Sequence, residues 1–223
     1  MESPLLKALE LVEQAWGGLT PISPPGKWVT VVLAVCERLE PKEMNRRLLG
    51  WLDESLLGEP QKLEQVGSTT VAAVLKDHGL PGSAAGPLVR LAEWWVRQFG
   101  NERNVDSWPQ TTEWLRQQWR CLPRVSLVLA DRLLLFVADR AVVPLNRGLV
   151  RVVCRHGWLE PTAEYEEWQE FLVRALERDT NRLRACSLAL TRVGRECCGR
   201  TAHCERCLLA SLLPASGPVE PEE

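Results

Sequence analysis

The sequence has no stretch of about 18 uncharged apolar residues, the shortest run expected of a membrane-spanning helix. Its N-terminal segment carries acidic residues inside a helical pattern, whereas a signal peptide has a basic start and an apolar centre. We therefore expect no membrane partner and a cytoplasmic location. The eight cysteines would be reduced there, so metal binding or packing is expected for them before disulfides.

An excess of positive charge is also absent, because the formal net charge at pH 7 is -2. Proteins that coat nucleic acid are basic, so this balance argues mildly against DNA as a partner. The distribution of charge weakens that objection, since all five lysines precede residue 77 and 16 of the 22 arginines follow residue 115. Arginine suits phosphate recognition, although a GC-rich genome accounts equally well for an arginine-rich half.

Strand patterns and internal repeats are missing as well. Apolar residues instead recur at three and four positions nearly throughout the chain, which is the pattern of amphipathic helices. Clusters of glycine and proline such as "GGLTPISPPG" and "GLPG" separate these segments. With 45% hydrophobic residues the chain can bury a core. We predict an all-α protein of roughly ten short helices.

Four cysteines lie close together near the C-terminus, in "CCGRTAHCERC" at residues 197–207. Two residues separate Cys204 from Cys207, and a tight turn of that length brings both sulfur atoms to one side of a metal. Cys197 and Cys198 are adjacent and do not easily bind one ion together, so they are alternative third ligands. The other interpretation is that all four are small buried hydrophobic residues of a C-terminal helix pair.

The longer stretch "LALTRVGRECCGRTAHCERCLLASLLP" resembles the C-terminal loop of the endonuclease III-like DNA glycosylases. In that family a helix ending in Gly-Arg or Gly-Lys leads into Cys-x6-Cys-x2-Cys-x5-Cys around a 4Fe–4S cluster. The first three cysteine positions are matched by Cys197, Cys204 and Cys207, but Leu213 stands at the fourth. The resemblance therefore implies an incomplete ligand set. We expect no stable cofactor, because a cluster with an open iron site is labile.

A second stretch, "LPRVSLVLADRLLLFVADRAVVPLNRGLVRVVCRHGW" at residues 122–158, resembles the core segment of the same family. Ala130-Asp131 followed by an aliphatic run is similar to the branch related to 3-methyladenine glycosylases. Weaker likeness extends over almost the whole chain. The resemblance implies a two-lobed helical helix-hairpin-helix fold. Residues 28–144 would form the central lobe, residues 1–27 with 145–223 the second, and the cleft between them the DNA site.

The hairpin departs from the family pattern at its two glycine positions, which are Arg124 and Ser126. In the family these glycines let the backbone turn and expose N–H groups to a DNA phosphate. The Arg124 guanidinium and the Ser126 hydroxyl would be the DNA-binding groups here. The alternative is a helix turn that binds nothing.

The catalytic positions depart further. Val128 stands where bifunctional relatives hold the lysine that forms a Schiff base, so strand cleavage through an imine is excluded. Asn146 aligns with the aspartate whose carboxylate stabilises the cationic sugar as the base departs. An amide carries no charge, and such electrostatic stabilisation is worth on the order of 10²–10³ in rate. The other carboxylates nearby are Asp131 and Asp139, and we expect Asp139 to pair with an arginine.

Three arginines after Asn146 recur every four residues and would share one face of a helix: Arg147, Arg151 and Arg155. Such a row could follow DNA phosphates, although a solvated charged face is the more general explanation. Cys36 occupies the position from which relatives insert a polar side chain into the duplex, and we interpret it as a core residue. Most of the ten tryptophans alternate with leucines at helical spacing, so we expect them in the core as well.

Together these departures favour a divergent base-excision-repair protein that binds double-stranded DNA as a monomer and has lost or weakened N-glycosylase activity. One alternative is an active monofunctional glycosylase that removes alkylated bases flipped from the duplex. Another is a helical protein-interaction module unrelated to DNA.

Overall fold

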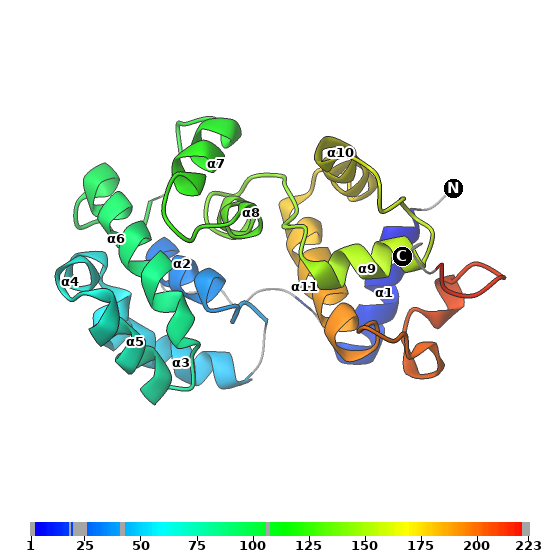
Figure 1. Cartoon of the computed structure of the whole chain (residues 1–223), viewed down its shortest axis with the longest axis horizontal. Helices are drawn as coiled ribbons and strands as arrows, with labels where there is room; N and C mark the ends of the chain where they lie inside the picture. Colours follow the sequence, from blue (N-terminus) through cyan, green and yellow to red (C-terminus); the bar gives the residue numbers. More distant parts are fainter. Residues whose placement is uncertain (1–2, 18, 20–25, 41–42, 106–107, 220–223) are drawn as a thin grey trace. The chain divides into compact units, whose positions relative to one another are not determined.

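The computed structural model describes residues 3–17, 19, 26–40, 43–105 and 108–219. Within these ranges there are eleven α-helices and no strand, which confirms the all-α prediction (Figure 1). The helices are α1 (Pro4–Trp16), α2 (Lys27–Val35), α3 (Glu43–Glu54), α4 (Pro60–Gln65), α5 (Ser68–Asp77), α6 (Ala85–Phe99), α7 (Thr112–Arg120), α8 (Leu127–Phe136), α9 (Arg147–Arg155), α10 (Tyr165–Ala175) and α11 (Thr180–Glu196). Short 3-10 turns lie at Leu56–Gly58, Gly82–Ala84, Cys204–Arg206 and Ala210–Leu212.

The chain divides into two compact units. Residues 21–140 form what we call the central unit, and residues 1–20 with 141–223 form the terminal unit. Figure 1 shows α2 to α8 in the first and α1 with α9 to α11 in the second. The sequence analysis places the two boundaries at 27/28 and 144/145, whereas the units of the structure divide at 20/21 and 140/141.

The central unit is built around α2, the helix that its sequence "KWVTVVLAV" makes apolar on nearly every face. All its residues from Trp28 to Val35 are buried, as expected of a helix that is hydrophobic all round. Beside it lies an aromatic cluster whose ring centroids are 5.1 to 6.4 Å apart, formed by Trp28, Trp94, Trp95, Phe99, Trp108 and Trp119. The prediction that most tryptophans are core residues is confirmed for this cluster.

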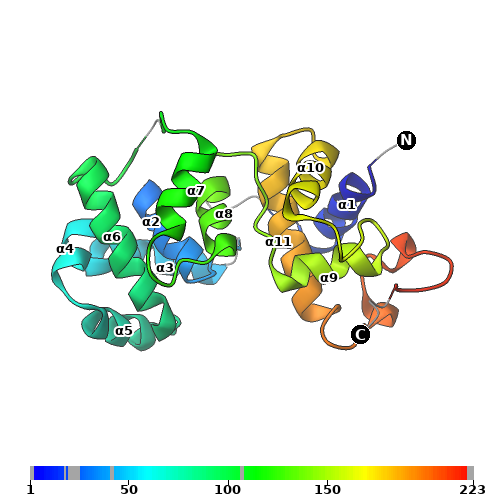
Figure 2. The same ribbon diagram turned by 45° about the horizontal axis from the view of Figure 1, so that its top comes forward.

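The terminal unit depends on a close crossing of α9 and α11, which Figure 2 shows beside each other. Two glycines allow it. A Cβ atom added to Gly194 of α11 would lie 2.4 Å from the Cα atom of Gly148 in α9, a distance that backbone atoms do not tolerate. The crossing therefore requires glycine on α11, and it brings the start of α9 against the C-terminal part of α11.

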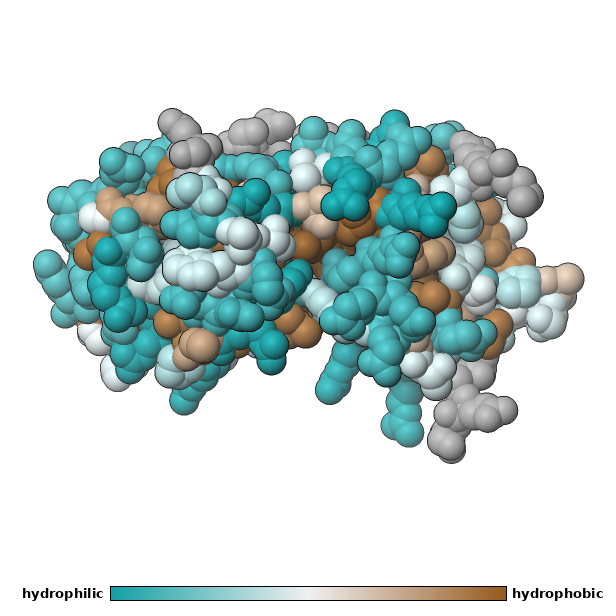
Figure 3. Space-filling view, turned by 90° about the horizontal axis from the view of Figure 1, so that it is seen from above, coloured by the Kyte–Doolittle hydropathy of each residue, from teal (hydrophilic) through white to brown (hydrophobic). Residues whose placement is uncertain are grey.

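The surface is polar over most of the face drawn in Figure 3. Among the described residues, the exposed large hydrophobic side chains are Trp114 and Val219. None of the described helices combines the length and apolar character that crossing a bilayer demands.

Candidate nucleic-acid interface

A tight turn joins α7 and α8 at the place where the sequence predicts the hairpin. The Val125 N–H donates to the Leu122 carbonyl over 3.1 Å, with Pro123 and Arg124 as the two central residues. Arg124 has a φ angle of +67°, in the left-handed region. Proline followed by a left-handed residue is the arrangement of a type II turn, whose third position favours glycine. The hairpin turn thus forms without the glycine that it favours.

Holding Arg124 in this conformation costs about 1 kcal/mol, since only glycine enters the left-handed region freely. The side chain crosses the first turn of α6. A Cβ atom added to Gly86 would lie 3.2 Å from Cδ and 3.3 Å from Nη1 of Arg124, so the absence of a side chain at Gly86 makes room for the guanidinium group. The turn therefore presents a cation beside the first turn of α6 in place of a bare glycine.

Ser126 caps the N-terminus of α8. Its hydroxyl oxygen accepts a hydrogen bond from the Leu129 N–H over 3.2 Å. The N–H groups of Leu127 and Val128 belong to the first turn and have no intrahelical acceptor. Such a helix end favours an anion in front of it. Phosphate binding by Arg124 and Ser126 stays a prediction that this geometry permits.

The two hairpin helices are tied together by a buried ion pair. Arg116 of α7 donates through Nε to Asp131 of α8 over 2.9 Å, and the Asp131 side chain is only 1% exposed. Arg116 also binds Glu113 through Nη1, over 2.7 Å. Asp131 is therefore a structural residue of the hairpin. Asp139, the other candidate carboxylate, has Lys27 as an ion-pair partner at 2.6 Å, which the sequence reasoning did not foresee.

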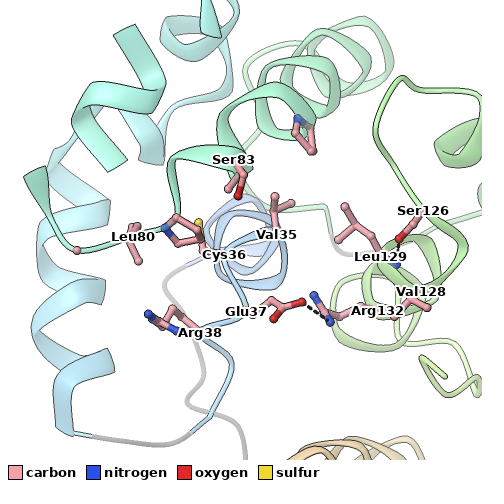
Figure 4. A pocket seen from close by; sticks show the side chains of 14 residues that line it. Val35, Cys36, Glu37, Arg38, Leu80, Ser83, Ser126, Val128, Leu129 and Arg132 are labelled. Atoms are coloured by element: carbon pink, nitrogen blue, oxygen red, sulfur yellow. Dashed lines mark hydrogen bonds and ion pairs between the residues drawn. The ribbon is translucent and has the colours of Figure 1, made fainter. Parts of the chain in front are cut away.

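A cavity of about 690 Å³ lies beside the start of α8 (Figure 4). Its walls come from the end of α2, the link between α5 and α6, and α8 itself. Val128 lies half-buried in the wall, with Ser126 on the same side. Arg132 crosses the α8 side of the cavity, where it donates to the Ala34 carbonyl and to Glu37, each over 3.0 Å.

Cys36 also contributes to this wall but is only 1% exposed. Burial raises the pKa of its thiol to about 12, so it is protonated at neutral pH. Its interpretation as a core residue is confirmed. An exposed side chain able to enter a duplex is not found at this position.

Asn146 is the N-cap of α9 in the terminal unit. Its Oδ1 accepts hydrogen bonds from the N–H groups of Gly148 and Leu149, over 3.0 and 3.1 Å. Asparagine is among the best residues at this position because it satisfies helix N–H groups that have no other acceptor. The position predicted to have lost its catalytic carboxylate therefore has a second function as a helix cap.

The other end of the Asn146 amide is also engaged. Nδ2 donates to Thr191 Oγ1 of α11 over 2.7 Å, and that hydroxyl donates its own proton to the Ser187 carbonyl over 2.5 Å. Thr191 thus accepts from the amide N–H, which fixes Oδ1 toward the helix amides. The environment of residue 146 matches an amide on both sides.

The three arginines of α9 have different environments. Arg147 is exposed, Arg151 is half-buried and reaches the Gly194 carbonyl over 3.5 Å, and Arg155 is only 5% exposed. Arg155 donates to the carbonyls of Gly199 and Arg200 over 2.9 and 3.0 Å. The prediction that Arg155 belongs to a row of phosphate-binding arginines is therefore wrong, because its guanidinium group is buried and holds the C-terminal loop.

The C-terminal loop is held by side chains of α9 and the residue after it. Besides its two carbonyl acceptors, Arg155 donates to Cys198 Sγ over 3.4 Å. The ring nitrogens of His156 lie 2.7 Å from the Val152 carbonyl oxygen and 3.2 Å from that of Leu209. The Arg155 guanidinium and the His156 imidazole thus hold the C-terminal loop, the segment that resembles the cluster-binding loop of the glycosylase family.

The cysteines of this loop do not fit a four-thiolate cluster. Cys197 and Cys198 are buried and Cys204 and Cys207 are half-buried, while the fourth position is the half-buried Leu213. Burial, followed by the neighbouring thiols, raises the pKa of Cys207 to about 11. Among the described side chains, no three His, Cys, Asp or Glu residues converge on a metal-sized site.

Several residues that shape this interface were missed by sequence reasoning. Thr191 lies 45 positions from its amide partner, and Gly86 makes room for an arginine 38 positions away. Pairing across such separations leaves no periodic signal. The ion pair of Arg116 with Asp131 had a weak signal, because Asp131 is a charged residue inside the apolar run "LVLADRLLLF".

Comparisons with known proteins agree with this fold. No protein-family model matches the sequence. A relative from Methanocaldococcus jannaschii, named "Putative DNA repair glycosylase", is 22% identical over 166 residues, which cover 74% of this chain and 75% of the relative.

Three solved structures of DNA glycosylases share the fold. An endonuclease III trapped in a covalent intermediate with DNA has a TM-score of 0.63 at 14% identity, over 95% of this chain and 96% of that chain. A thermostable thymine-DNA glycosylase has a TM-score of 0.62 at 16% identity, over 93% and 92%. The 3-methyladenine DNA glycosylase of H. pylori, bound to 1,N6-ethenoadenine, has a TM-score of 0.60 at 15% identity, over 88% and 98%.

Proposed function

We propose, from the premise that this chain has the fold of the endonuclease III-like helix-hairpin-helix DNA glycosylases, that it is a divergent DNA repair glycosylase-like protein. In this proposal it binds double-stranded DNA as a monomer, and its N-glycosylase activity is lost or weakened. The observation that supports lost or weakened activity is the Asn146 amide, which is hydrogen-bonded through both Oδ1 and Nδ2.

DNA binding is supported by the hairpin and by the relatives. The endonuclease III structures of the same fold are complexes with DNA. In this chain the turn before α8 offers the Arg124 guanidinium, the Ser126 hydroxyl and the first N–H groups of the helix, which together suit one phosphate. Arg147 adds an exposed cation beside the cap of α9.

Loss of catalysis is supported by what the candidate carboxylates and nucleophiles do. Hydrolysis of the N-glycosidic bond develops positive charge on the sugar, and a nearby carboxylate lowers the barrier by stabilising that charge. The amide of Asn146 offers no charge, and Val128 offers neither a base nor a nucleophile. Asp131 is buried in its ion pair with Arg116.

The loop cysteines support a protein without an iron–sulfur cluster. Three thiols and a leucine leave one iron without a protein ligand, and Arg155 with His156 already fixes the loop. Anaerobically purified protein should carry no stoichiometric iron or acid-labile sulfide. Stoichiometric iron that resists chelation would contradict this part of the proposal.

The experiment that tests DNA binding compares two glycine substitutions. Arg124→Gly removes a charge from the hairpin turn and also relieves its left-handed strain, so the fold should be unchanged or more stable by up to about 1 kcal/mol. If Arg124 contacts a phosphate, fluorescence anisotropy with a duplex should show weaker binding and a salt dependence lower by about one charge.

Arg178→Gly is the matched control, because Arg178 is also an exposed arginine with positive φ, +57°, but lies after α10 in the terminal unit. It should leave the salt dependence unchanged. Equal effects of the two substitutions on duplex binding would show that the hairpin does not bind phosphate through Arg124. Absence of any duplex binding by the wild type would refute the proposed function.

A further inference from the structure

A partly exposed aromatic pair lies in the central unit and is not part of the buried tryptophan cluster. The indole of Trp51, in α3, stacks on the imidazole of His78, which follows α5, with ring centroids 3.7 Å apart and planes inclined by 38°. Trp51 is half-buried and His78 is exposed. Each ring therefore retains accessible surface that the core does not use.

The pair borders a second cavity of about 230 Å³. Ligand pockets span about 300–1,000 Å³, so this one suits a single ring system with a small attachment. It shares Arg38, Gly79 and Leu80 with the larger cavity beside α8. The two cavities are thus consecutive along one surface of the central unit, and the larger one includes the hairpin cap Ser126.

Two cations accompany the aromatic wall. Arg47 of α3 lines the small cavity and is exposed, and Arg38 lies at the boundary between the two cavities. An aromatic surface for a planar ring, with guanidinium groups beside it, matches a nucleobase attached to phosphates. A neutral apolar ligand would have no use for either charge.

We propose that the cavity at Trp51 and His78 binds an unpaired nucleotide of a DNA strand next to the duplex held by the hairpin. The base stacks on the aromatic pair, and the phosphates of the same strand lie by Arg47 and Arg38. This inference rests on the proposed DNA binding and adds a preference to it, for DNA in which a single strand adjoins a duplex.

The continuity of the two cavities is what favours a strand over a free nucleotide. A strand that leaves the hairpin face passes Arg38 and Leu80 before it reaches the indole, because both residues border both cavities. A free mononucleotide would gain the stacking but would not be held by the hairpin. The strand therefore binds more tightly by virtue of being attached to the duplex.

The test uses wild-type protein and two duplexes, one blunt and one with a short single-stranded tail that contains 2-aminopurine. The fluorescence of this base falls when it stacks on an aromatic ring. We expect tighter binding of the tailed duplex, with quenching on binding. Trp51→Leu should remove the quenching and lower the affinity for the tailed duplex by about 5- to 150-fold. It should leave the affinity for the blunt duplex unchanged.

Trp114→Leu is the matched control, since Trp114 is the exposed tryptophan of α7 and does not line either cavity. It should preserve both quenching and preference. Arg47→Gln should lower the salt dependence of tail binding by about one charge while the blunt duplex behaves as before.

Three results would overturn the inference. They are equal affinity of wild type for the two duplexes, loss of tail preference with Trp114→Leu as large as with Trp51→Leu, and binding of 2-aminopurine nucleoside monophosphate as tight as that of the tail. If the blunt duplex binds normally in any of these cases, the proposed function stands without this site. Failure to bind any duplex would instead refute the proposed function, and quenching of a single-stranded oligonucleotide by Trp51 would still test the cavity.

Discussion

Asn146→Asp is the most informative single change, because it alters one atom in the described hydrogen-bond network. The carboxylate oxygen that replaces Oδ1 would accept from Gly148 and Leu149 as the amide oxygen does. Aspartate caps helices about as well as asparagine, and a negative charge at a helix N-terminus is favourable by about 0.3–1 kcal/mol. The variant should therefore fold.

The oxygen that replaces Nδ2 would lie against Thr191 Oγ1, now 2.7 Å away. Two acceptors would then face each other unless the Thr191 hydroxyl turns its proton from the Ser187 carbonyl to the carboxylate. This rotation of the Thr191 hydroxyl costs little free energy, because the Ser187 carbonyl still accepts the N–H of Thr191 in the helix. The rotated hydroxyl holds the carboxylate in place and favours its charged form.

If the terminal unit still presents this position to the sugar of a flipped nucleotide, the added charge should raise base excision by about 10²–10³ over wild type. Duplexes with alkylated or oxidised bases are incubated with protein, abasic sites are cleaved with alkali, and the products are measured. Asn181→Asp adds the same charge in the first turn of α11, where Asn181 is exposed, and should give no excision. Strong wild-type excision that survives Asn146→Ala would refute the reasoning.

Three further changes test the packing around the interface. Asp131→Ala should destabilise the protein by about 3–5 kcal/mol in denaturant unfolding, because the largely buried Arg116 loses its buried carboxylate partner. Arg155→Met should expose the C-terminal loop to protease at unchanged helical content, since three acceptors lose their donor. Stability should fall as pH rises from 9 toward 12, because burial raises the pKa of Cys36 and Cys186 to about 12, so their thiols ionise first in the unfolded chain.

Much of the helical architecture could be predicted because apolar spacing is a local property. The segment "STTVAAVLKDHG" becomes α5, and "KWVTVVLAV" becomes the buried α2. The six-residue α4 was missed, since it is too short to show a period. The apolar spacing of "EMNRRLLGWLDESLL" at residues 43–57 predicts one helix. In the structure α3 ends at Glu54, and Ser55, which accepts from the Leu57 N–H, starts a 3-10 turn.

The candidate site was predictable only in part. Spacing placed Arg147, Arg151 and Arg155 on one face of α9, but it carried no information on where that face points. The C-terminal loop after α11 packs against the end of α9, and Arg155 is buried because it donates to the Gly199 and Arg200 carbonyls of that loop. The hydrogen bond of Asn146 with Thr191 depends on the close crossing of α9 and α11, which a single sequence does not reveal either.

Single-turnover excision by the wild type is the most direct test of the central claim that this fold binds DNA without efficient catalysis. Protein in excess is mixed with a duplex that carries an alkylated base, at a concentration where anisotropy shows the duplex to be bound, and abasic product is followed over time. We predict a bound duplex with almost no product, and a marked rise with Asn146→Asp. Rapid release of the base by the wild type, at a rate that Asn146→Ala does not change, would contradict the account.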